Sequence, residues 1–122
     1  MIDYQIYKII HLGGLALLLL GLGGLLFAFA TNKDIPAKLR SLGFAIHGIG
    51  LFLMLLGGFG MAARLQLMSQ FPGWLYAKVA VWLIMGGMVA LVKRKSQHAP
   101  ALVFGITFLV GTAAYLAIYK PF

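Results

Sequence analysis

The sequence predicts an all-α protein embedded in a membrane, a transmembrane four-helix bundle with up-down topology. Of its 122 residues, 62% are hydrophobic and only 10% are charged, whereas a soluble domain has about 25% charged residues. The apolar residues also gather into four runs of about 20, the length that an α-helix needs to cross a bilayer. Such a chain cannot cover a surface that faces water. We therefore expect a single transmembrane domain over residues 1–122 and no soluble module.

The four expected spans are residues 9–30, 41–63, 71–92 and 99–119. Pro36, Pro72 and Pro100 stand at or just before helix starts, where the missing amide proton is harmless. The end of the first run, Ala28-Phe29-Ala30, is similar to a signal-peptide cleavage site. The run is longer than a typical signal core, so we expect it to be retained as a span.

Basic residues at the ends of the spans predict the orientation of the bundle. Loops 31–40 and 93–98 share one side of the membrane, and both termini share the other side with loop 65–70. The first side has six basic residues and the second has four: Lys33, Lys38, Arg40, Lys93, Arg94 and Lys95 against Lys8, Arg64, Lys78 and Lys120. The positive-inside rule then predicts both termini outside the cytoplasm.

Charge and composition also limit the function. The net charge of +8 lies at the ends of apolar runs, so we expect membrane lipids as partners rather than nucleic acid. The chain has no cysteine, which excludes disulfides and thiolate metal sites. Its two acids, Asp3 and Asp34, lie outside the spans, so carboxylate-based hydrolysis or proton pumping is not expected. Whether the protein is an enzyme stays open.

Two glycine-rich seams, each with one histidine, indicate a function. At the seven-residue period of packed helices, one seam reads Tyr7, His11, Gly14, Leu18, Gly21, Leu25, Ala28, and the other reads Gly43, His47, Gly50, Met54, Gly57, Met61, Arg64. Small residues let membrane helices approach closely. A histidine beside Gly14 or Gly50 would also offer a flat macrocycle both a ligand and a smooth wall. The alternatives for each histidine are a hydrogen bond to a neighbouring helix, and proton or quinone chemistry.

Depth decides which residues could share one haem iron. At 1.5 Å per residue, His11 lies roughly 28 Å from the cytoplasmic end and His47 roughly 9 Å, a mismatch of about 19 Å. Ligation of one iron by both histidines is therefore disfavoured. Met61, roughly 30 Å deep, lies near the level of His11, and two basic residues there could pair with carboxylates of a cofactor. The sharpest candidate is thus an outer site made of His11, Met61, Arg64 and Lys78.

Weaker candidates involve the other sulfur and aromatic residues. An inner site would pair His47 with Met88. Met54, Met61 and Met68 repeat every seven residues and could bind Cu(I), although packing explains such a stripe too, so copper is less favoured than haem. All five tyrosines (Tyr4, Tyr7, Tyr76, Tyr115, Tyr119) and Trp74 fall on the outer side, where they form an interfacial belt or line a site that opens outward.

Short motifs add a resemblance. Arg40-Ser41-Leu42 precedes the second span, the third begins with Phe71-Pro72-Gly73-Trp74-Leu75-Tyr76-Ala77-Lys78 and ends with Lys93-Arg94-Lys95, and the fourth closes with residues 114–121. Over nearly its whole length the chain resembles the SirB-type family of small four-span proteins of the bacterial inner (plasma) membrane. That family has an acidic residue after the second histidine, where this chain has Gly48-Ile49-Gly50. The layout is also similar to small histidine-bearing membrane proteins of haem biosynthesis and copper resistance, which implies haem or metal handling.

The leading hypothesis is an inner-membrane protein that binds b-type haem for electron transfer or haem handling, with His11 as the best ligand. A second copy of the chain or a membrane redox partner would then be its protein partner. The main alternative is a non-catalytic scaffold or regulatory protein with structural histidines. A quinone or another small ligand at the outer face is the third hypothesis.

Overall fold

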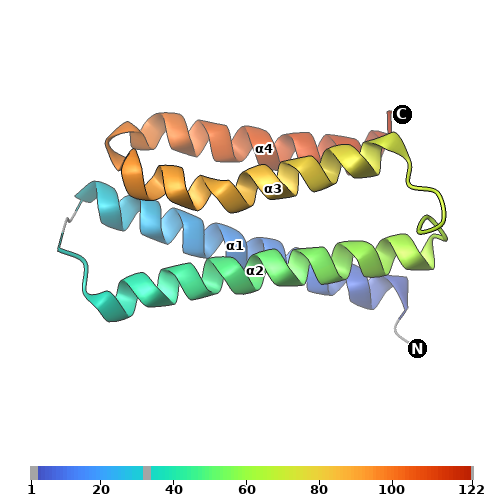
Figure 1. Cartoon of the computed structure of the whole chain (residues 1–122), viewed down its shortest axis with the longest axis horizontal. Coiled ribbons are helices and arrows are strands. Elements are labelled where there is room, and N and C mark those ends of the chain that lie inside the picture. The colour runs from blue at the N-terminus through green and yellow to red at the C-terminus, as the bar shows by residue number, and fades with distance from the viewer. Residues whose placement is uncertain (1–2, 32–33, 122) are drawn as a thin grey trace.

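The protein forms a bundle of four antiparallel helices. The structure, a computed structural model, describes residues 3–31 and 34–121. In chain order it contains α1 (Tyr4–Thr31), α2 (Ala37–Arg64), α3 (Gly73–Arg94), the short 3₁₀ helix η1 (Ser96–His98) and α4 (Ala99–Tyr119). The start of α1, the end of α4 and the α2–α3 loop lie at one end of the bundle, called here the terminal end (Figure 1). The α1–α2 and α3–α4 connections lie at the other, called the loop end. The predicted fold class is confirmed.

All four helices have the dimensions of membrane spans. They contain 28, 28, 22 and 21 residues, and about 20 suffice to cross a bilayer. Each is also apolar enough to span a membrane. The chain thus has the architecture of a multi-pass integral membrane protein.

The ends of the helices differ from the predicted spans by a few residues. α1 begins at Tyr4, five residues before the predicted 9–30, and α2 begins at Ala37, four before 41–63. The sequence pattern marks the apolar stretch, but a helix continues past it wherever its backbone donors are satisfied. At the start of α1, the Ile6 amide donates a 3.0 Å hydrogen bond to Oδ1 of Asp3, which is the usual role of an N-terminal capping residue.

The two predicted seams form the contact between α1 and α2. A Cβ atom added at Gly14 would lie 2.9 Å from the carbonyl oxygen of Gly50, and one added at Gly21 would lie 2.8 Å from that of Gly43. No side chain fits at these points, so the two backbones touch directly. This close pairing is the one that small residues permit in membrane helices. α3 and α4 form a second, looser pair.

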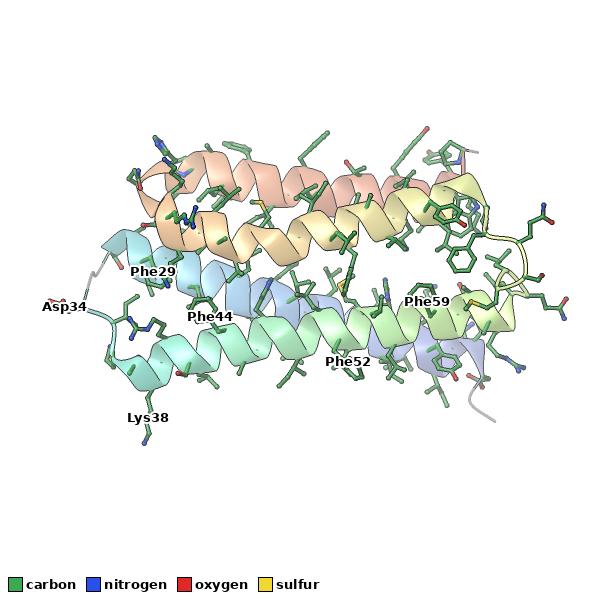
Figure 2. The ribbon with its side chains drawn as sticks, in the orientation of Figure 1. Phe29, Asp34, Lys38, Phe44, Phe52 and Phe59 are labelled. Carbon is green, nitrogen blue, oxygen red and sulfur yellow. The ribbon has the colours of Figure 1, made fainter. Side chains whose placement is uncertain are left out.

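The packed core joins the two pairs near the loop end. Its fully buried side chains are Leu18, Leu22, Leu26 and Val92, and α4 contributes Leu102 and Ile106. Phe29 and Phe44 pack against this core, whereas Phe52 is 61% exposed on the outside of α2 (Figure 2). Toward the terminal end the buried residues become fewer, and the space between the pairs is not filled.

Candidate functional site

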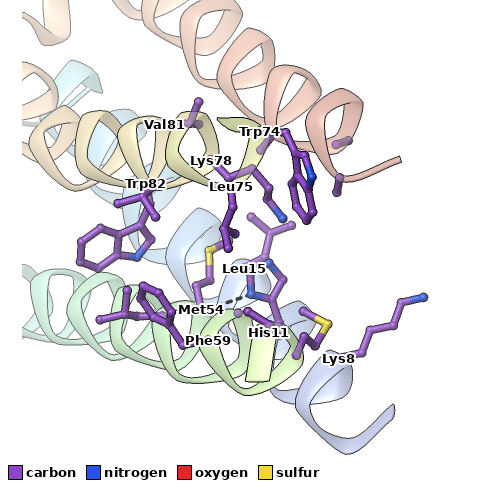
Figure 3. A pocket seen from close by; sticks show the side chains of 18 of the residues that line it. Lys8, His11, Leu15, Met54, Phe59, Trp74, Leu75, Lys78, Val81 and Trp82 are labelled. Carbon is purple, nitrogen blue, oxygen red and sulfur yellow. Dashed lines mark hydrogen bonds between the residues drawn. The ribbon is translucent and has the colours of Figure 1, made fainter. Parts of the chain in front are cut away.

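A cavity of about 390 Å³ lies between the two helix pairs toward the terminal end (Figure 3). All four helices contribute to its lining, which is mostly apolar. The polar, charged and amphipathic side chains in the lining are Tyr4, Lys8, His11, Trp74, Lys78, Trp82 and Lys120. Its volume lies in the range of about 300–1,000 Å³ that is typical of small-molecule sites. A mostly apolar hollow with a few convergent polar groups is the usual form of such a site.

His11 is held in a defined orientation at this cavity. Its Nδ1 donates a 2.8 Å hydrogen bond to the backbone carbonyl of Met54 on α2. Because a carbonyl can only accept, Nδ1 carries the proton, and in the neutral imidazole Nε2 then keeps a lone pair. A Cβ at Gly58 would lie 3.5 Å from the imidazole, so the ring rests against the α2 backbone. Histidines that bind metals are oriented in the same way, through a hydrogen bond from the other ring nitrogen.

His47 lies in a different environment. It is 3% exposed, and its Nδ1 donates a longer bond of 3.4 Å to the carbonyl of Leu18. Within residues 3–31 and 34–121, its buried Nε2 has no hydrogen-bond partner. His47 lines neither the cavity above nor the smaller hollow beside Gly43. The predicted inner partner, Met88, is itself buried in the core. The structure therefore places His47 in a helix contact and not at an open site.

The two histidines lie at different depths, but less far apart than the sequence suggests. The carbonyl that His11 contacts belongs to Met54, seven residues beyond His47, and the one that His47 contacts belongs to Leu18, seven beyond His11. Seven helical residues correspond to about 10 Å, so the predicted 19 Å is too large. The prediction placed Ala30 level with Ser41, whereas α2 begins four residues before Ser41. The two rings still do not face one another across a single site.

The other predicted site residues divide into two groups. Met61 and Lys78 line the cavity together with His11. Arg64 is exposed at the end of α2 and is not part of the lining. Gly14 and Gly50 are buried in the α1–α2 contact, so they cannot be the smooth wall predicted for a macrocycle. The structure thus brings together part of the predicted outer site.

Several lining residues were not predicted from the sequence. Lys120 follows α4 in a left-handed conformation, with φ of 49°, and its Nζ lies 5.5 Å from the centre of the Trp74 ring. Trp82 donates a 3.0 Å hydrogen bond from Nε1 to the carbonyl of Leu51, which links α3 to α2 beside the cavity. Lys8 completes the lining from α1. No local signal marks these contacts, because each joins helices that are far apart in the sequence.

Only some of the aromatic residues and methionines predicted for the outer side line the cavity. Tyr4 and Trp74 line the cavity, whereas Tyr115 and Tyr119 contact each other with ring centres 5.1 Å apart. Met54 and Met61 line it as well, but Met68 is 50% exposed in the α2–α3 loop. Among the residues that the structure describes, no three histidine, cysteine or acidic side chains come together as a metal site.

Comparison of the chain with models of protein families finds no match, and none is found among curated proteins or solved structures. The resemblance to the SirB-type family therefore stays a prediction. A fold alone does not specify a function, so the function has to be inferred from the cavity and its residues.

Proposed function

We propose that the protein binds b-type haem in the cavity at the terminal end, where His11 would hold the iron, in the bacterial inner membrane. The observation that carries this proposal is the hydrogen bond from His11 Nδ1 to the Met54 carbonyl beside a cavity of about 390 Å³. It holds the imidazole in the tautomer whose Nε2 lone pair is available for a metal. Haem would supply one-electron chemistry, and electron transfer or haem handling follows from that.

The rest of the lining suits a flat apolar ligand. Phe59, Trp74 and Trp82 provide aromatic surface around the cavity (Figure 3). Met61 lines it too and offers a thioether, a ligand type that electron-transfer haem proteins also use together with histidine. We also propose that both termini lie outside the cytoplasm, so that the cavity is near the outer face. A second copy of the chain or a membrane redox partner would then exchange electrons or haem with it.

The second candidate is a scaffold or regulatory protein without a cofactor. It is favoured by the hydrogen bonds of both histidines to carbonyls of the partner helix, which a structural role alone would explain. Such bonds contribute about 0.6 kcal/mol on average in membrane proteins. The scaffold hypothesis does not account for a cavity whose described lining has three lysines and no acidic residue, and this is why we place it second.

The test is a haem titration of the purified protein in an uncharged detergent. Wild-type protein should give a Soret band with the position and width of ligated haem, and His11→Ala should abolish it. His47→Phe is the matched control and should retain the band, whereas Met61→Leu should shift it if the thioether is the second ligand. A wild-type protein that stays colourless, or a band that is unchanged in His11→Ala, would reject haem binding at this site. Binding of a quinone instead would support the third hypothesis.

A further inference from the structure

Lys78 is a basic residue inside a membrane span, and no acidic residue among those that the structure describes pairs with it. It lies in the second turn of α3, lines the cavity and is half-buried. Over the described ranges it forms no ion pair or hydrogen bond. Of the chain's two acids, Asp3 accepts a bond from the Ile6 amide at the start of α1, and Asp34 lies at the loop end (Figure 2). A charged group at such a position is costly, so it usually marks a functional site.

Two further lysines join Lys78 around the same cavity. Lys8 enters the lining from α1 and Lys120 from the end of α4, and both are exposed, so they form the rim. Lys78 is close enough to Lys120 and to His11 for electrostatic interaction with each. Like charges gathered beside an apolar hollow repel one another. No acid belongs to the cavity lining within the described ranges, so an anion from outside would relieve that repulsion.

We infer that the cavity selects its ligand by negative charge, and that Lys78 binds a carboxylate of the ligand, with Lys8 and Lys120 as the basic rim. This inference rests on the proposed function, because the carboxylates of haem are its two propionates. Lys8 precedes His11 by three residues, about one helical turn nearer the terminal end, and Lys120 lies beyond the end of α4. The charged edge of the ligand therefore faces the membrane surface, and its apolar part lies deeper. Arg64, also predicted for this role, does not line the cavity, and the lysines that do come from α1, from α3 and from the residue after α4.

The experiment compares haem with haem dimethyl ester, which has the same iron and ring but no carboxylates. Wild-type protein in an uncharged detergent should bind haem at least about 10-fold more tightly than the ester, because hydrogen bonds between charged groups are stronger than those between neutral groups. Lys78→Met should reduce the affinity for haem to that for the ester, and should leave the affinity for the ester unchanged. Lys78→Arg keeps the charge and should keep most of the preference for haem.

The matched control is Lys38→Met, an exposed lysine at the loop end (Figure 2), which should change neither affinity. Helix content measured by circular dichroism identifies a variant that has lost its fold. Equal binding of haem and ester by wild-type protein, with a Soret band that depends on His11, would overturn charge selection and leave haem binding intact. Failure of both compounds to bind would overturn the inference together with the proposed function.

Discussion

The regions around His11 and His47 have the same sequence pattern and different surroundings. Each histidine stands three residues before a glycine of its seam, Gly14 or Gly50, and each donates from Nδ1 to a carbonyl of the partner helix. At His11 this bond is 2.8 Å long and the ring borders a cavity. At His47 it is 3.4 Å long, and Nε2 is buried with no hydrogen-bond partner among the residues that the structure describes.

The difference comes from the second helix pair. Near the loop end α3 and α4 pack onto α1, and Leu22 and Val92 are completely buried there. Toward the terminal end the pairs are joined across the cavity by side chains such as Trp82, which reaches the carbonyl of Leu51. The same histidine motif is therefore structural where the pairs meet and accessible where they do not. A motif in one helix pair acquires its role from the packing of the other pair.

The largest change in stability is expected from shortening a leucine at the packed end of the bundle, and comparing it with a leucine beside the cavity tests whether the two ends differ in packing. Leu22→Ala at the packed end should lower the free energy of unfolding by about 2–5 kcal/mol, because it leaves a cavity in a filled core. Leu15→Ala should cost less than half as much, because Leu15 already borders a cavity and is only partly buried. Unfolding by denaturing detergent, followed by circular dichroism, measures both. Equal losses would mean that the two ends are equally well packed.

The next effect concerns the glycine seam at each histidine. A Cβ at Gly57 would lie 2.6 Å from the backbone nitrogen of His11, and one at Gly21 would lie 2.6 Å from that of His47. Alanine at either position should destabilise the bundle by about 1–3 kcal/mol through overpacking. Only Gly57→Ala should also weaken haem binding, because it displaces His11, the residue proposed to bind the iron. Gly24→Ala is the control, because nothing lies within 4 Å of its added Cβ. A comparable loss in the control would contradict the close contact of α1 with α2.

A smaller effect is expected at the link between the pairs. Trp82→Phe removes the hydrogen bond to the Leu51 carbonyl while keeping an aromatic ring. Hydrogen bonds between membrane helices contribute about 0.6 kcal/mol on average and up to about 1.7 kcal/mol, so the unfolding free energy should fall by that amount. Thermal unfolding in detergent measures it, with Trp74→Phe as the comparison. If Trp82→Phe lowers the free energy of unfolding no more than Trp74→Phe does, this hydrogen bond does not hold the two helix pairs together.

The smallest effect is expected at His47. His47→Phe removes a long hydrogen bond and also the buried Nε2 that has no partner in the described part of the chain, and these two changes oppose each other. The unfolding free energy should therefore change by less than about 1 kcal/mol. The same unfolding titration detects this. A loss of several kcal/mol would reveal an interaction at His47 that matters more than its geometry suggests.

The sequence by itself determined the four helices, their alternating directions and the two seams. These features depend on local properties, namely the length of an apolar run and the spacing of small residues along one helix. Close pairing of the two seams follows from their small residues, whereas the register, which sets Gly14 against Gly50 and Gly21 against Gly43, is known only from the structure. The level of His11 relative to α2 was predicted less well by counting residues, because His11 contacts the carbonyl of Met54, seven residues or about 10 Å before Met61 along α2.

Only the tertiary structure decided which histidine borders a cavity and which lysines surround it. In a membrane protein, side chains facing lipid and side chains in the core are both apolar, so periodicity does not separate them. Leu20 is 67% exposed and Leu22 is completely buried, although they are the same residue type in the same run. The convergence of Lys8, Lys78 and Lys120 on one cavity depends on how two helix pairs dock. That docking depends on the fit of side chains from distant parts of the chain, which no local pattern encodes.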